Sequence, residues 1–157
     1  MKGQVWTLDM ALSLMIFFAA LISVTMAWNF ISSDIAEGQE MTEMQLKAMT
    51  VSDALIRTPG IPEDWNNDTV TVIGLAYDDN ELDSSKVSEF VSMSYQKSRS
   101  LLGIVPYNFY FEVEDINGTV YTNSSLPMDP DADVIIPAIR YASYNGRIVK
   151  VNFFLWI

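Results

Sequence analysis

The feature that most constrains this chain is an uninterrupted apolar run near its N-terminus. From Met10 to Trp28 there are nineteen residues without a charge, and their only polar side chains are those of Ser13, Ser23 and Thr25. As a helix this run would be roughly 28 Å long, which is close to the hydrocarbon thickness of a bilayer. The other apolar runs, VIIPAI and VNFFLWI, are too short to span. The sequence therefore predicts one helix of the transmembrane type.

A cleaved secretory signal is the first alternative to a retained helix. Such a signal has an apolar stretch of about 7–15 residues, followed by a cleavage site of small residues. The run in this chain is longer, and the segment after it, NFISSDIAEGQEMTEM, contains no A-x-A site. We therefore expect the helix to remain in the mature protein.

Charge is distributed unevenly about the apolar run. The formal net charge is −11, and beyond Ser32 the chain carries eight basic and nineteen acidic residues. Lys2 is the only basic side chain ahead of the run, so the positive-inside rule favours a cytoplasmic N-terminus and an external C-terminal body. An acidic body also argues against nucleic-acid binding, which relies on Lys and Arg to neutralise phosphates.

The pattern of a helix continues past the apolar run as far as Ile56. No proline occurs before Pro59, where the segment RTPGIP ends any helix. A continuous helix from about Gln4 to Ile56 would be on the order of 80 Å long. One stripe of its second half is apolar at helical spacing. That stripe can dock onto the chain's own globular part, contact neighbouring helices in an assembly, or do both; it comprises Met41, Met44, Ala48, Val51 and Leu55.

The rest of the chain predicts short strands and one further helix. That helix runs from N-capping residues at Asp83–Ser85 to Leu102 and is stopped by Gly103. The pairs Asn117-Gly118 and Asn145-Gly146 predict two hairpin turns. Strands are expected at 69–76, 108–114, 119–122, 135–143 and 147–157.

These elements predict an α+β fold, in which a long N-terminal helix packs on a small antiparallel β-sheet with one extra helix. In the last strand one face is expected to be covered by the long helix, and it comprises Val149, Val151, Phe153, Leu155 and Ile157. Phe154 and Trp156 lie on the opposite face, which is therefore not expected to be wholly solvated. Residues 1–3 are expected to be a short leader, 4–31 the membrane half of the helix, and 32–157 an external domain that includes the distal half.

The sequence offers little for catalysis. It contains no His and no Cys, and no P-loop, G-x-S-x-G, H-E-x-x-H or glycine-rich dinucleotide motif. The acids of DPDAD at 129–133 lack the glycine and the distal glutamate of an EF-hand loop. We expect a solvated loop there, and neither enzymatic activity nor a metal or other cofactor.

Three sequons lie in predicted turns of the external body. Asn67, Asn117 and Asn123 each begin an Asn-x-Ser/Thr triplet. Such triplets are N-glycosylation acceptors when they are exposed in an exported domain. Asn117 has a second explanation, because Asn-Gly is the pair that a hairpin turn prefers.

The first residues resemble the class III signal of archaeal type IV pilin-like proteins. In that family a K/R-G-Q leader precedes a carboxylate and then the apolar helix; here Lys2-Gly3-Gln4 is followed by Asp9. The later segments TPGIPEDW, VIGLA and LLGI are also similar to archaeal pilin-like membrane proteins, although less specifically. The bacterial G-F-x-x-x-E signature is absent.

The resemblance implies a function and a set of partners. A prepilin peptidase would cut after Gly3 or after Gln4, and Asp9 would serve in assembly as the sixth or the fifth mature residue. The chain would then be a major or minor subunit of a surface filament used for adhesion, held in the membrane before assembly. Its partners would be further copies or other pilin subunits.

Two other functions share the expected topology. One is a membrane-anchored external binding domain that never polymerises, for which Trp6 and Trp28 would be interfacial anchors. The other, an anchored enzyme, is opposed by the missing catalytic residues. Processing of the leader and homotypic contacts of the helix distinguish the filament subunit from the anchored binding domain.

Overall fold

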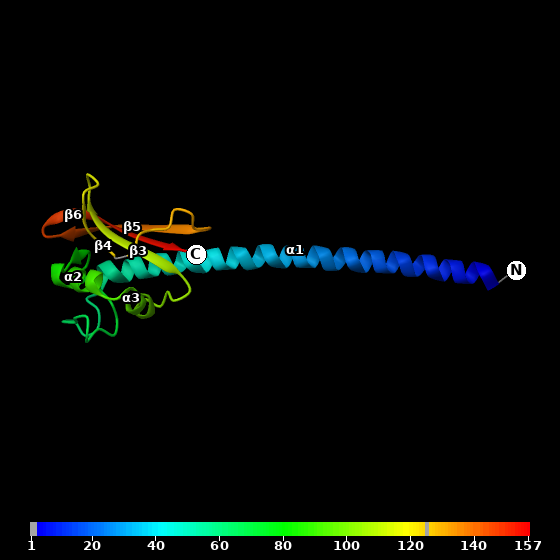
Figure 1. Cartoon of the computed structure of the whole chain (residues 1–157), viewed down its shortest axis with the longest axis horizontal. Helices are drawn as coiled ribbons and strands as arrows, with labels where there is room; N and C mark the ends of the chain where they lie inside the picture. The colour runs from blue at the N-terminus through cyan, green and yellow to red at the C-terminus, as the bar shows by residue number, and fades with distance from the viewer. Residues whose placement is uncertain (1–2, 125) are drawn as a thin grey trace. The chain divides into compact units, whose positions relative to one another are not determined.

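A computed structural model describes residues 3–124 and 126–157 of the chain, with residues 3–7 and 33–37 described by their backbone alone. The long helix α1 spans Gly3–Arg57 (Figure 1). By their contacts the residues form two compact units, Met1–Thr42 and Glu43–Ile157. The sequence-based boundary at residues 31 and 32 concerns the membrane rather than contacts within the chain, so it stays a prediction.

The described residues of the first unit all belong to α1. Every described side chain from Leu8 to Ser32 is exposed. The helix forms because this segment contains no proline and is rich in Ala, Leu and Met, which are strong helix formers.

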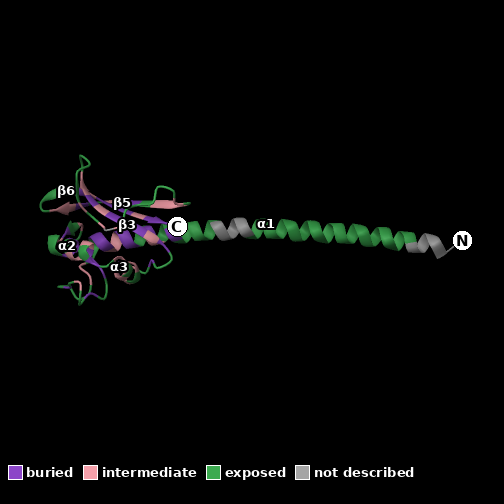
Figure 2. Ribbon diagram, in the orientation of Figure 1, coloured by how far each residue is buried: buried purple, intermediate pink, exposed green. Residues whose placement is uncertain are grey.

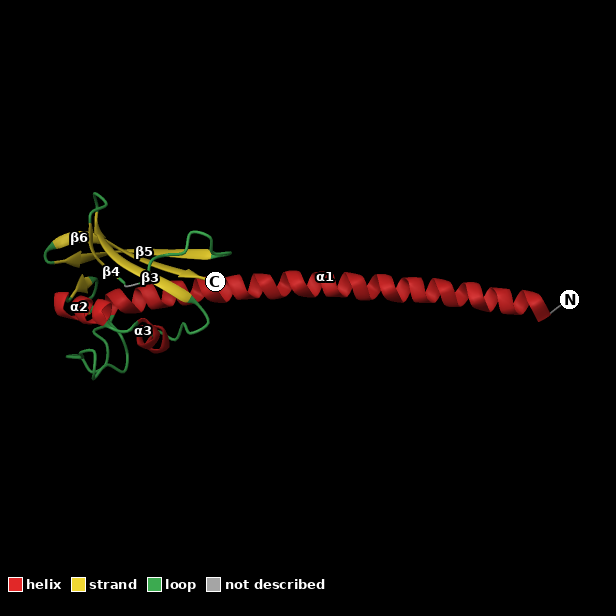
Figure 3. Cartoon of the chain, in the orientation of Figure 1, coloured by secondary structure: helices red, strands yellow, loops and turns green. Residues whose placement is uncertain are grey.

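The second unit combines the end of α1 with a mixed sheet and two short helices (Figure 3). The sheet has six strands in the order β1-β2-β5-β6-β3-β4. All neighbouring strands are antiparallel except β2 and β5, which run parallel. The elements are β1 (Ala76–Asp78), β2 (Glu81–Leu82), α2 (Ser84–Ser92), α3 (Tyr95–Leu101), β3 (Asn108–Asp115), β4 (Val120–Asn123), β5 (Ile135–Tyr144) and β6 (Arg147–Trp156).

The core of the second unit lies between α1 and one face of the sheet. Figure 2 shows buried residues along the end of α1 and in the strands beside it. On α1 the predicted stripe is buried, with Met44, Ala48 and Leu55 each at 0% exposure. Met41 is exposed and lies in the first unit, outside this core. The predicted inner face of β6 is confirmed for four residues that are fully buried: Val149, Val151, Phe153 and Leu155. Ile157, the fifth residue predicted there, lies beyond the end of β6 and is 41% exposed.

The other sheet face is not simply solvated. Trp156 points away from the α1 side by strand alternation, yet it is only 3% exposed. The loop before β5 is hydrogen-bonded to the residue that follows β6. The Asp133 N–H donates to the Ile157 carbonyl, and the Ile157 N–H donates to the Val134 carbonyl. Leu126, Ala132 and Val134 pack against the core that includes Trp156.

The two hairpin turns were predicted correctly. Asn145 and Gly146 both have positive φ, as a two-residue turn of this kind requires. At the β3–β4 turn only Gly118 has positive φ, and the Gly118 N–H donates to the Asp115 carbonyl. A register shift next to Glu114 accompanies this longer turn.

Three local expectations are wrong. Residues 69–76 do not form the expected strand. Only Ala76 belongs to a strand, at the start of β1, and Val72 forms an isolated bridge with Ile61. Trp65 explains this, because its Nε1 donates to the carbonyls of Pro59 and Gly74 and holds the segment as a loop. The single helix expected to run to Leu102 is two helices, because Met93 has an extended backbone. The sheet is also not wholly antiparallel.

Candidate functional site

The first candidate site is the exposed apolar stretch of α1 from Leu8 to Ser32, called here the apolar segment. It is 25 residues long, has a mean hydropathy of 2.3 and buries none of its side chains within the structure. It is long and apolar enough to anchor the chain in a membrane, although a signal sequence would share these properties.

Two polar side chains of the apolar segment, those of Ser23 and Thr25, bond within the helix. Ser23 Oγ donates to the Ala19 carbonyl at 2.8 Å. Thr25 Oγ1 lies 3.1 Å from the Leu21 carbonyl and 2.9 Å from that of Ile22. Since these hydroxyls are satisfied within the helix, they do not oppose immersion in lipid.

The residues expected to be processed or to act in assembly lie at the start of α1. Gly3 and Gln4 belong to α1, but their side chains and all of Lys2 lie outside the described residues. Asp9 is exposed and lies beyond the first turn, in which α1 has no acidic residue. The helix dipole acts mainly within the first turn, so it contributes little at Asp9 in this full-length chain.

The three sequon asparagines stand in different surroundings. Asn117 is exposed in the β3–β4 turn, where its Nδ2 lies 3.2 Å from Asp115 Oδ1. Asn123 belongs to β4, and its Nδ2 donates to Tyr110 Oη at 3.2 Å. Asn67 is half-buried and accepts from Lys97 through its backbone carbonyl. Asn117 and Asn123 are therefore both more exposed than Asn67, and Ser125 of the third sequon lies outside the described residues.

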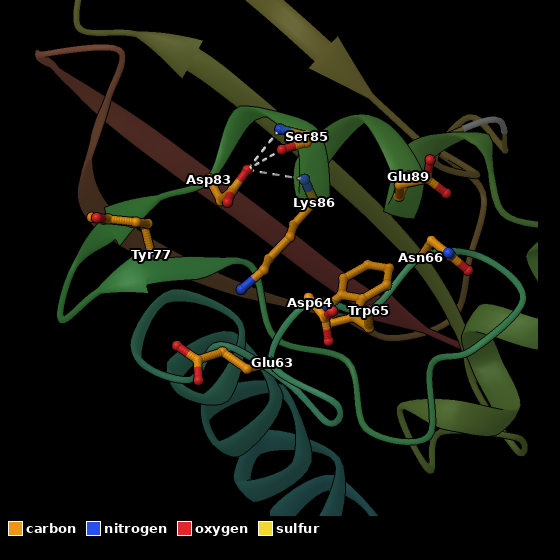
Figure 4. A pocket seen from close by; sticks show the side chains of 9 residues that line it. All are labelled: Glu63, Asp64, Trp65, Asn66, Tyr77, Asp83, Ser85, Lys86 and Glu89. Carbon is orange, nitrogen blue, oxygen red and sulfur yellow. Dashed lines mark hydrogen bonds between the residues drawn. The ribbon is translucent and has the colours of Figure 1, made fainter.

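The second candidate site is a cavity of about 620 Å³ in the second unit, called here the Lys86 cavity. Its walls come from the loop after α1, from β1 and from the first half of α2 (Figure 4). The lining residues are Glu63, Asp64, Trp65, Asn66, Tyr77, Asp83, Ser85, Lys86 and Glu89.

Lys86 forms the inner part of this cavity. The residue is 8% exposed, and its Nζ donates to the Pro59 carbonyl at 3.0 Å and to the Ala76 carbonyl at 3.1 Å. The Pro59 carbonyl also accepts from Trp65 Nε1, at 3.0 Å. The loop after α1 and the start of β1 are thus joined to α2 through one buried ammonium group.

Asp83 fixes the wall formed by α2. It is the N-cap of that helix, and its Oδ1 accepts from the Ser85 N–H at 2.8 Å, from Ser85 Oγ at 2.5 Å and from the Lys86 N–H at 3.3 Å. Burial would raise the pKa of Asp83, but these hydrogen bonds and the Lys86 charge lower that pKa overall. The carboxylate therefore stays ionised at neutral pH.

Neither candidate site has the donor set of a metal centre. Among the described residues, no group of three or more His, Cys, Asp or Glu side chains is close enough to hold a metal ion. In the acidic loop, Asp129 Oδ1 instead accepts from the Asp131 N–H at 3.0 Å. This is a local turn, as expected for a solvated loop.

The sequence predicted the apolar segment but not the Lys86 cavity. Lys86 and Ser85 were expected in a helix near its N-cap, and Trp65 in the break after the long helix. No periodic pattern indicates that these stretches meet, or that Lys86 is buried. The helix start at Asp83 was the only local signal for part of this cavity.

Comparison of this chain with protein-family models, with curated proteins and with solved structures finds no match.

Proposed function

We propose that this chain is a structural subunit of an archaeal type IV pilus-like surface filament. The observation that carries the proposal is the apolar segment, in which 25 consecutive helical residues bury none of their side chains within the structure. The same helix supplies Met44, Ala48 and Leu55 to the core of the second unit. One continuous element therefore offers an uncovered apolar surface and is fixed to a folded domain, as a polymerising subunit requires.

Two environments can cover the apolar segment. Lipid covers it before assembly, and a bundle of identical helices replaces lipid in the filament, where packing and exclusion of water keep it stable. Lys2-Gly3-Gln4 is the matching processing sequence. A prepilin peptidase cutting there, on the cytoplasmic side, would release the helix for assembly without removing it. Asp9 would then neutralise the new amino terminus of a neighbouring subunit.

The filament and the anchored binding domain give different mature N-termini. The test is intact-mass measurement and N-terminal sequencing of the protein from native cells, with and without the prepilin peptidase. We expect cleavage after Gly3 or Gln4 only when the peptidase is present. An unprocessed Met1 in peptidase-positive cells would overturn the filament proposal in favour of the anchored domain.

Filament formation is measured separately on sheared surface material. Asp9→Ala should remove the protein from the sedimenting filament fraction while leaving its membrane level unchanged. The matched control is Asp129→Ala, which removes an exposed acid from the loop before β5. If Asp9→Ala enters filaments as well as this control does, the assembly role of Asp9 is wrong.

A further inference from the structure

The Lys86 cavity has free hydrogen-bond acceptors along its rim. Among the described residues, the carboxylates of Glu63 and Asp64 accept no hydrogen bond, and both residues are exposed. Glu89 uses Oε2 to accept from the Asn67 N–H at 2.9 Å, which leaves Oε1. Asp83 uses Oδ1 for the helix cap and keeps Oδ2. A ligand in this cavity must therefore bring hydrogen-bond donors.

Lys86, in contrast, offers the cavity a hydrogen-bond donor. The residue is more than nine-tenths buried, and Figure 4 shows its side chain extending from α2 toward the space between Tyr77 and Asp64. Two of its three N–H bonds reach neutral carbonyls, and the third reaches no described residue. No carboxylate lies within ion-pair distance among the described residues, whose ion pairs are Arg140–Asp53 and Lys150–Glu114. The third N–H is therefore available to an oxygen acceptor of a ligand.

Tyr77 adds an apolar surface to the same cavity. It lies in β1, lines the cavity and is 75% exposed. At this exposure Tyr77 is not part of the core. The flat face of its aromatic ring is therefore available as a packing surface for apolar C–H groups.

From these three features we propose that the Lys86 cavity binds a neutral saccharide. Each sugar hydroxyl both donates and accepts, so hydroxyls can bond the rim carboxylates and also take the third Lys86 N–H. The C–H face of the sugar ring then packs on Tyr77. An anionic sugar is rejected because four carboxylates and one ammonium leave the lining net negative. A simple amine leaves the Lys86 N–H unused.

The size of the cavity agrees with a ligand of this class. Its volume of about 620 Å³ lies within the usual range for small-molecule sites and admits one or two sugar rings. All lining residues belong to the second unit. The saccharide proposal therefore does not depend on filament assembly. It can be tested whether the chain is a filament subunit or an anchored binding domain.

The test is saturation-transfer NMR on the full chain in a sugar-free detergent, because alkyl glycoside detergents would compete. The probes are the methyl glycosides of glucose, galactose and mannose, with N-acetylglucosamine as a fourth. Methyl glucuronide, ethanolamine and Mg²⁺ serve as the anionic, amine and metal comparisons. We expect saturable binding of at least one neutral sugar and much weaker binding of all three comparisons.

Variants then locate the binding. Tyr77→Ala should weaken sugar binding about five- to tenfold, as expected for loss of one aromatic packing surface. The double variant Glu63→Gln with Asp64→Asn should weaken it by a similar factor. The controls are Tyr141→Ala, which removes a 61% exposed tyrosine from β5, and Glu43→Gln with Asp131→Asn, which makes the same charge change elsewhere.

Several outcomes would overturn the proposal. One is the absence of saturable binding by all four neutral sugars. Another is equal loss in the Tyr141 or the charge control, which would show nonspecific association. Binding of ethanolamine or Mg²⁺ as tight as that of the sugars would instead make the cavity a cation site.

Discussion

At the scale of single residues, two glycines stand in opposite surroundings. A Cβ at Gly74 would overlap the Thr58 carbonyl oxygen and the Gly60 nitrogen, both of which are backbone atoms. A Cβ at Gly38, in α1, would meet nothing within 4 Å. Backbone atoms cannot rotate away as a flexible side chain can, so the first position requires glycine.

Gly74→Ala should destabilise the second unit by about 2–3 kcal/mol, through forced displacement of the loop after α1. Gly38→Ala should leave that stability unchanged and raise helix content slightly, because alanine is the better helix former. Urea unfolding followed by near-UV circular dichroism of the full chain measures the first effect, and far-UV signal the second. Equal stability of the two variants would contradict the close approach at Gly74.

Asp83 makes stability depend on pH. Its pKa is lower in the folded chain than the ordinary value of 3.8, so its stabilising contribution is fully present above that value. The contribution is lost as the pH falls through the lowered folded-state pKa. Asp83→Ala should cost about 1 kcal/mol at pH 7, as for loss of an N-cap.

The companion variant separates charge from capping. Asp83→Asn keeps a capping oxygen, so its smaller deficit at pH 7 should disappear as the pH falls through the lowered folded-state pKa of Asp83. Paired urea titrations across this range measure the convergence. Asp131→Asn, in an exposed loop, is the control and should follow the wild-type chain. A constant gap between Asp83→Asn and wild type at all pH values would contradict the assigned shift.

At the scale of elements, α1 behaves differently on its two sides within the second unit. Met44 is fully buried in the core, whereas Met49 is 55% exposed on the same helix. The pair allows the same substitution, with the same change in helix propensity, to be compared in two environments.

Met44→Ala should destabilise the second unit by about 2–5 kcal/mol, because it leaves a cavity beneath the sheet. Met49→Ala should change stability by no more than about 0.5 kcal/mol. The measurement is the midpoint of urea unfolding, compared between variants whose dependence of unfolding free energy on urea concentration is the same. Similar midpoints for the two variants would mean that the buried stripe of α1 is assigned to the wrong side.

Elements with a strong pattern were predictable from the sequence. β6 has an apolar residue at every second position from Val149 to Leu155, and Asn145-Gly146 fixes the preceding turn, so both appear where expected. Residues 69–76 are β-branched as a strand would be, but their local preference is overridden by the Trp65 bonds to Pro59 and Gly74. The pairing of β2 with β5 has no sequence signal either, since β2 contains two residues.

At the scale of the whole molecule, the core is confined to the second unit. Every buried hydrophobic residue of the core cluster lies at or beyond Met44. The side chains that form the Lys86 cavity lie there as well, which explains why its construction could not be predicted. The cavity depends on tertiary placement of the loop 59–76 rather than on any periodic pattern.

A chain that begins at residue 43 should therefore fold and remain soluble without detergent. Its urea transition should be cooperative and lie close to that of the full chain, because no core side chain has been removed. The matched control, a chain that begins at residue 58, loses the α1 stripe and should not fold. A noncooperative transition in the longer fragment would show that residues 1–42 contribute to the core.

The core of the second unit contains residues from its first and its last elements: Met44 to Ile56 of α1 and Val149 to Trp156 of β6. β6 leaves the ribosome roughly 6–25 s after the apolar segment at usual rates of synthesis. The apolar segment thus emerges long before the core half of α1 has a partner. Under the proposed function, insertion into a membrane would precede folding, and the domain would complete its longest-range contacts on a chain that is already tethered.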